Sequence, residues 1–307
     1  MTQSFSHLMS PGQIGCMKLR NRIIMPPMIK NYATPDGFVT RQLIDHYAAR
    51  AKGGAGLLII EASYVHNTGR CWRQGIAIDD DHCILGLANL VDAVKLWGSK
   101  IAIQLVHGGR QAQAIITKKP TIAPSAVTYP NAESMPREIT LQEIAEMIEA
   151  FAQSARRAKE AGFDAIELHG AHGYLISQFF SPNTNRRTDK YGGDLKGRAT
   201  FALEVIQRTR ALVGPDYPII IRLNGEDTVE GGLTVADSRK LAQILEKAGV
   251  NALHISIGTS EANQDIRTLG TSGTYLSPRG HLVDYAAQIK KLVKIPVITV
   301  SSLTPEM

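Results

Sequence analysis

The sequence predicts an α/β protein, a TIM (β/α)8-type barrel of which seven of the eight strands are present in this chain. Short apolar runs alternate with longer segments whose apolar residues recur at helical spacing. The runs are almost continuously hydrophobic, as expected for a parallel sheet that is buried on both faces. The joins from helix to strand are short and contain glycine, whereas the joins from strand to helix are long and polar, especially 106–139 and 170–197. In a barrel the loops that follow the strands carry the chemistry.

The strands and helices alternate along the whole chain. The expected strands are residues 22–26, 57–61, 100–105, 164–169, 218–223, 252–257 and 296–300. The expected helices are residues 40–52, 81–98, 140–161, 198–213, 234–248 and 283–293. Thr140 followed by Glu143 is a capping-box pattern, and Thr234 precedes a helix that ends near Gly249.

A doubly wound open sheet is the alternative architecture. However, no G-x-G-x-x-G motif follows an expected strand, and the GGAG at 53–56 precedes one. We therefore expect a single domain over residues 1–307, a (β/α) barrel.

Composition excludes several classes of protein. The net charge is +6, but lysine and arginine are scattered and do not interleave with aromatic residues, so we expect no nucleic-acid partner. The three cysteines form no C-x-x-C pair, which favours a reducing compartment and predicts neither a disulfide framework nor a zinc site. The start lacks a signal-peptide pattern, and no apolar run approaches the roughly 18 residues of a membrane span. We expect a cytoplasmic protein that acts on a small molecule.

The expected strand ends bring polar side chains together. They carry Pro26, Pro27 and Met28; Glu61 and Ala62; Gln104, His107 and Arg110; Glu167, His169, His172 and Tyr174; and Arg222 and Asn224. An amide, an arginine, two histidines and a tyrosine at one barrel mouth suit an anionic, hydrogen-bonding cofactor and a carbonyl substrate. No serine or cysteine nucleophile is arranged with a base.

The segment 167–198, ELHGAHGYLISQFFSPNTNRRTDKYGGDLKGR, is the most specific in the chain. Together with NRIIMPPM, IQLVHGGR and PIIIRLN, it resembles the Old Yellow Enzyme family, in the branch of NADH:flavin oxidoreductases that includes 2,4-dienoyl-CoA reductase-like proteins. The resemblance extends over nearly the whole chain. It implies an FMN-dependent oxidoreductase that uses NAD(P)H as co-substrate to reduce the C=C bond of α,β-unsaturated carbonyl compounds, of the enoate or dienoyl thioester type. It is compatible with a homo-oligomer.

The resemblance also implies which residues bind the cofactor. Gln104 would read the pyrimidine edge of the flavin with its carboxamide, which offers a donor and an acceptor. Arg222 would lie near the N1/C2=O edge or the ribityl phosphate and stabilise negative charge on the reduced flavin. The backbone around Pro27, Met28 and Ala62 would line the ring.

Three further residues are implied to be catalytic. His169 and His172 would bind the carbonyl oxygen of the substrate and polarise it. The β-carbon would then accept hydride from the flavin, and Tyr174 would supply a proton to the α-carbon.

The chain departs from the family pattern at two places. Ile29 stands where the family commonly has a threonine or cysteine beside the flavin. The family also continues past the seventh strand with an eighth strand and loops for the FMN phosphate, whereas this chain has Ser301-Ser302 and stops at Met307. We therefore expect a barrel truncated before its eighth strand. An iron–sulfur cluster and FAD would belong only to a missing C-terminal region.

Other interpretations stay open for these residues. His169 and His172, with Glu167 nearby, could hold a divalent metal in a barrel lyase or aldolase, but no third ligand cluster appears, so no metal is expected. Gln104 and Arg222 could instead be polar groups satisfied inside the barrel. The chain could also be a fragment that is unable to hold flavin. The remaining residues of the long motif are expected to tie their loop down, namely Arg187, Asp189, Tyr191, Gly192, Gly193 and Arg198.

Overall fold

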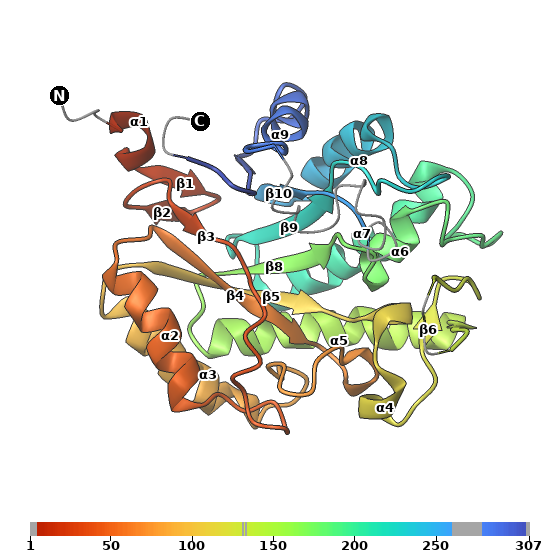
Figure 1. The fold of residues 1–307 in the computed structure, drawn as a ribbon, viewed down its shortest axis with the longest axis horizontal. Helices are drawn as coiled ribbons and strands as arrows, with labels where there is room; N and C mark the ends of the chain where they lie inside the picture. Colours follow the sequence, from red (N-terminus) through yellow and green to blue (C-terminus); the bar gives the residue numbers. More distant parts are fainter. Residues whose placement is uncertain (1–4, 131, 133, 260–277, 305–307) are drawn as a thin grey trace.

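The computed structural model describes residues 5–130, 132, 134–259 and 278–304. Its main sheet is parallel, and its strands follow one another in space in the same order as in the chain (Figure 1). They are β3 (Ile24–Met25), β4 (Leu57–Tyr64), β5 (Lys100–Val106), β8 (Ala165–Gly170), β9 (Ile219–Asn224), β10 (Ala252–Ser256) and β11 (Val297–Ile298). A doubly wound sheet reverses this order at its centre, so that alternative is wrong. The prediction of a barrel with seven strands in this chain is confirmed, and β3 and β11 are the two edges of the described sheet.

Helices cover the outside of the sheet, one after each of its first six strands (Figure 1). They are α2 (Arg41–Lys52), α3 (Cys83–Lys95), α5 (Leu141–Glu160), α7 (Leu195–Val213), α8 (Val235–Lys247) and α9 (Val283–Lys290). Thr140 and Glu143 form the predicted capping box at the start of α5, and Thr234 forms another with Asp237 at the start of α8. No helix in the described part of the chain is both long and apolar enough to span a membrane.

Several short elements were not predicted from the sequence. They are α1 (Ser6–Met9), β1 (Gly12–Ile14), β2 (Met17–Leu19), η1 (Asn67–Gly69), η2 (Gly109–Gln111), α4 (Ala114–Thr117), β6 (Ile122–Ala123), β7 (Arg137–Glu138) and α6 (Leu175–Phe180). All have six residues or fewer, so they are too short to show a hydrophobic period. Five of them, η2, α4, β6, β7 and α6, lie in the two long segments that the sequence indicated as loops.

The inside of the sheet is filled in layers, because alternate residues of each strand point inward. The antiparallel hairpin of β1 and β2 packs its apolar side chains against inward residues of the main strands, and these residues form one buried cluster: Ile14, Met17, Leu19, Leu57, Ile59, Ala102, Ala165, Ile220, Ala252 and Ile298. Two residues further along the same strands come Gln104, Glu167, Arg222 and His254. The apolar layer therefore fills the sheet at the start of the strands, and polar residues take over toward their carboxyl ends.

Candidate active site

A cavity of about 380 Å³ opens at the carboxyl ends of the strands. It is lined by Pro26, Pro27, Met28, Ile29, Ala62, Trp72, Gln104, His169, His172, Tyr174, Arg222, His281, Leu282, Val300 and Ser301. The structure therefore brings all eight predicted site residues together around one space. Sequence reasoning did not find Trp72, His281 or Leu282, because they come from connecting segments that carry no recognisable pattern.

Three aromatic side chains of the β8–α6 segment form one wall of this cavity. The ring centroid of His169 lies 5.0 Å from that of His172 and 4.7 Å from that of Tyr174, with edge-to-face geometry in both pairs. Trp72, from the segment between β4 and α3, contacts the ring of Tyr174 in the same manner at 6.0 Å. The predicted catalytic residues are thus in mutual contact.

The backbone at His172 adopts a left-handed conformation, with φ of 61°, which is unusual for a residue other than glycine. Hydrogen bonds from two other segments hold it in place. The amide of His172 donates to Oδ1 of Asn224 at 3.2 Å, and Nε2 of Gln111 donates to the carbonyl oxygen of His172 at 2.8 Å. These contacts turn the chain so that both histidines face the cavity.

The histidines are neutral and the tyrosine is protonated in this environment. Burial, and then the charge of Arg222, lowers the pKa of His169 and of His172 well below the usual value for histidine. Burial likewise raises the pKa of Tyr174. The backbone amide of Ala171 donates to Nδ1 of His169 at 3.4 Å, so the ring proton of neutral His169 is assigned to Nε2. The wall of the cavity therefore offers uncharged hydrogen-bond donors.

A buried polar layer supports the cavity from the barrel interior. Nε2 of Gln104 donates to Oε1 of Glu167 at 2.7 Å, and Nδ1 of His254 lies 2.7 Å from Oε2 of the same carboxylate. This arrangement fixes which way the Gln104 amide points. Sequence reasoning missed His254, although it lies within the expected strand 252–257.

Arg222 bridges the polar layer and the cavity wall. Its Nη2 donates to Oγ of Ser256 at 3.2 Å, whereas its buried Nε has no hydrogen-bond partner among the described residues. An unpaired, buried guanidinium N–H is costly unless a ligand accepts from it. Ser256, at the end of β10, is a further site residue that the sequence did not indicate.

Glu61 lies behind the loop that contributes Pro27 and Met28 to the cavity. Its Oε2 accepts from the backbone amide of Lys30 at 3.1 Å and from the Tyr47 hydroxyl at 3.3 Å. Burial raises the pKa of Glu61 to about 7. Glu61 thus supports the loop without lining the cavity.

His107 and Arg110, which also follow an expected strand, do not line the cavity. His107 accepts from the amide of Gly109 and pairs with the hydroxyl of Thr68 at 3.0 Å. Arg110 donates to the carbonyl oxygens of residues 127 and 128. Both shape the loop after β5.

The geometry does not favour a metal at the two histidines. Both carboxylate oxygens of Glu167, the neighbouring acidic residue, are engaged by Gln104 and His254. Within residues 5–130, 132, 134–259 and 278–304, no group of three or more His, Cys, Asp or Glu side chains is placed to hold a metal ion.

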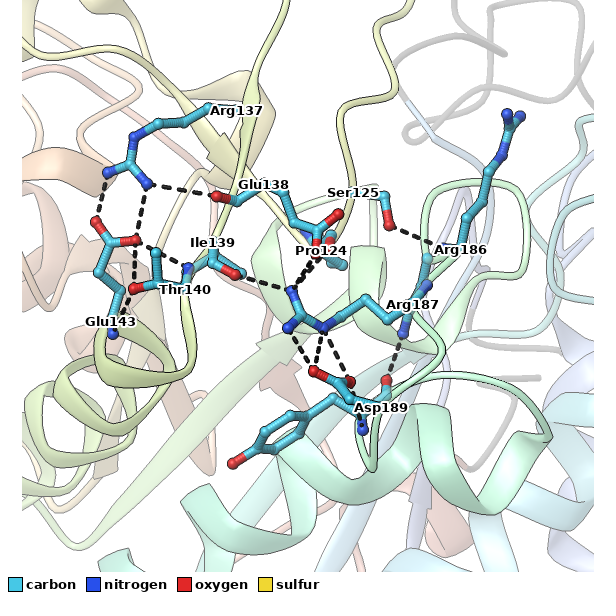
Figure 2. A network of polar contacts seen from close by, with 12 residues as sticks. Pro124, Ser125, Arg137, Glu138, Ile139, Thr140, Glu143, Arg186, Arg187 and Asp189 are labelled. Atoms are coloured by element: carbon cyan, nitrogen blue, oxygen red, sulfur yellow. Dashed lines mark hydrogen bonds and ion pairs between the residues drawn. The ribbon is translucent and has the colours of Figure 1, made fainter.

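The rest of the long motif ties its loop to the barrel (Figure 2). The buried guanidinium of Arg187 pairs with Asp189 and Glu138 and donates to the carbonyl oxygens of Pro124 and Ile139. A side chain at Gly192 would collide with the Arg187 carbonyl oxygen, since a Cβ there would lie 1.9 Å from it. These contacts agree with the structural role expected for these residues.

Comparison with known proteins gives a consistent result. The model of the NADH:flavin oxidoreductase / NADH oxidase family matches residues 7–307. An NADH oxidase of Thermoanaerobacter brockii is 46% identical over 302 residues, which cover 96% of this chain and 45% of that protein. An NADH:acrylate oxidoreductase of Vibrio harveyi is 38% identical over 296 residues, which cover 94% of this chain and 28% of that protein.

Solved structures agree at the level of the fold. A 2-naphthoyl-CoA reductase in complex with 2-naphthoyl-CoA superposes with a TM-score of 0.93 at 30% identity, covering 99% of this chain and 48% of that chain. The chain therefore spans less than half the length of these three proteins.

Proposed function

Because the chain belongs to the NADH:flavin oxidoreductase / NADH oxidase family, which is the family of the Old Yellow Enzymes, we propose that residues 1–307 are the FMN-binding barrel of an ene-reductase. The resemblance indicated by the sequence motifs is confirmed at the level of the family. The proposed reaction is reduction of the C=C bond of an α,β-unsaturated carbonyl compound by NAD(P)H. The activities for which two relatives are named, an acrylate oxidoreductase and a naphthoyl-CoA reductase, support this substrate class.

The residues around the cavity fit a flavin. The buried Nε–H of Arg222 lacks a partner among the described residues, and it suits the electron-rich edge of a flavin ring. The amide of Gln104 uses one N–H on Glu167, so its second N–H and its oxygen can pair with the pyrimidine edge. Pro27, Met28 and Ala62 supply a largely apolar surface for the ring. FMN bound here would supply hydride-transfer chemistry between NAD(P)H and the substrate.

The two histidines bind the substrate carbonyl oxygen in this proposal. Nε2–H of His169 donates to that oxygen, and the neighbouring ring of His172 approaches it from the side. Neutral donors stabilise the negative charge that develops on the oxygen as the β-carbon becomes reduced. Burial excludes water from these hydrogen bonds and so strengthens them.

Tyr174 gives a proton to the α-carbon. Its ring packs against His169 with centroids 4.7 Å apart, so its hydroxyl belongs to the same face of the cavity as the histidines. Because burial raises its pKa, the phenol carries its proton throughout the physiological range.

The observation that carries the proposal is the meeting of His169, His172 and Tyr174 with Gln104 and Arg222 around one cavity. The visible spectrum and the metal content of the purified chain, supplied with FMN, test it. We expect flavin absorption bands that bleach anaerobically with NADH or NADPH and return when cyclohex-2-enone is added. Bound divalent metal without flavin would point to a barrel lyase. Neither flavin nor metal would point to a barrel that cannot hold its cofactor.

A further inference from the structure

Ser256 is a buried serine at the end of β10 that joins two site residues from different segments. Its Oγ lies 2.6 Å from Nε2 of His172 and 3.2 Å from Nη2 of Arg222. Strand β10 runs beside β9, and Ser256 lies opposite Asn224 of β9. The side chain of Asn224 accepts a hydrogen bond from the backbone amide of His172. The position of His172 therefore depends on both strands.

The direction of the hydrogen bonds follows from the chemistry of the three groups. Arginine has no acceptor, so Oγ of Ser256 must accept from Arg222. The positive guanidinium turns the hydroxyl hydrogen of Ser256 away from itself, and Nε2 of His172 is the acceptor within reach. His172 is neutral, since burial and Arg222 both disfavour its charged form. Nε2 then carries no proton, and the ring proton is on Nδ1.

We propose that Ser256 is a positioning residue that holds His172 as the Nδ1–H tautomer and so makes it a hydrogen-bond donor toward the cavity. His169 offers Nε2–H, and His172 offers Nδ1–H, so that two N–H groups converge on one ligand oxygen. The ligand is a carbonyl or phenolic oxygen; this part of the inference rests on the proposed function, whereas the tautomer does not. Without the Ser256 hydroxyl, the ring proton can move to Nε2 and leave an acceptor facing the ligand oxygen.

Two measurements on the full chain loaded with FMN test this inference. The first is the tautomer of His172, read from long-range ¹H–¹⁵N correlation spectra of the labelled chain at neutral pH, with the signal assigned by its loss in His172→Asn. We expect protonation at Nδ1 in the parent and a shift toward Nε2 in Ser256→Ala. The second is the dissociation constant of phenol, which we expect Ser256→Ala to raise about tenfold, the scale of one hydrogen bond.

Two variants serve as controls. Ser256→Thr keeps the hydroxyl and should keep the parental tautomer and phenol affinity. Ser154→Ala removes an equally buried hydroxyl that donates to the carbonyl oxygen of Ile78, outside the cavity, and should change neither measurement.

The possible outcomes distinguish a failure of the role assigned to Ser256 from a failure of the proposed function. Protonation of His172 at Nε2 in the parent, or the same tautomer in the parent and Ser256→Ala, overturns the role of Ser256. A parent chain with the Nδ1–H tautomer that binds neither flavin nor phenol contradicts the proposed function and leaves the positioning of His172 supported. If Ser256→Ala does not fold, the parent and Ser256→Thr spectra still decide the tautomer.

Discussion

The carboxylate of Glu167 and the ring of His254 lie 2.7 Å apart, Oε2 to Nδ1, and neither side chain is exposed to solvent. The other oxygen of Glu167 accepts from Gln104. A single carboxylate from the central strand β8 thus connects β5 with β10 across the inside of the barrel. Removing it leaves two buried polar groups without a partner.

Glu167→Ala should therefore be strongly destabilising. We expect the free energy of unfolding to fall by roughly 3 kcal/mol or more, because loss of one partner leaves buried polar groups unsatisfied. Urea denaturation followed by circular dichroism measures this change. Glu146→Ala, at an exposed position on α5, should cost less than about 0.5 kcal/mol. Equal effects of the two substitutions would show that the buried layer contributes no stability.

Tyr174→Phe should separate the two half-reactions. Loss of the phenolic proton should slow reduction of cyclohex-2-enone by roughly 10²-fold or more, whereas reduction of the flavin by NAD(P)H should stay nearly unchanged. Anaerobic stopped-flow absorbance measures each step on its own. Tyr217→Phe, whose hydroxyl donates to the carbonyl oxygen of Phe163 outside the cavity, is the matched control. Equal slowing of both steps would exclude Tyr174 as the proton donor.

Glu61 should make stability depend on pH. Its pKa is raised from 4.5 to about 7 in the folded chain, so the folded state holds a proton that the unfolded state has already released. The stabilisation from this proton is fully present below pH 4.5 and is lost as the pH rises through about 7. The loss is on the order of 3 kcal/mol.

Glu61→Gln, which cannot ionise, should remove this dependence. We expect a flatter profile of unfolding free energy between pH 4.5 and 7 than in the parent chain, measured by urea denaturation at several pH values. Glu146→Gln should keep the parental slope. A parental slope in Glu61→Gln would show that another group is responsible.

Arg187→Ala should destabilise the loop that follows α6. The substitution removes a buried guanidinium that contacts two carboxylates and two backbone carbonyls, so we expect a loss of roughly 2–4 kcal/mol in unfolding free energy. The neighbouring Arg186 is exposed, and its side chain extends away from the network in Figure 2, so Arg186→Ala should cost less than about 0.5 kcal/mol. Limited proteolysis should detect faster cleavage after residue 180 in the first variant only.

The sequence by itself determined the order of strands and helices and eight of the residues that line the cavity. The long strands β4, β5, β8, β9 and β10 and the six outer helices are periodic enough to be recognised. Because parallel strands all present their carboxyl ends at one edge, a list of strand-end residues is already a list of neighbours, and His169, Gln104 and Arg222 meet as expected.

Only the tertiary structure decided how these residues are held. Ser256 and His254 come from a strand that is far from His172 and Glu167 in the chain, and no local pattern indicates such a pair. The left-handed backbone at His172 depends on Asn224 and Gln111, which also come from other segments. The hairpin of β1 and β2 is too short to show a hydrophobic period in the sequence. Its position is set by the apolar layer of the main sheet, against which its side chains pack. Local sequence sets the direction of each side chain along its own strand. Hydrogen bonds between strands set the protonation and orientation of the site residues, and only the folded, curled sheet brings those strands together.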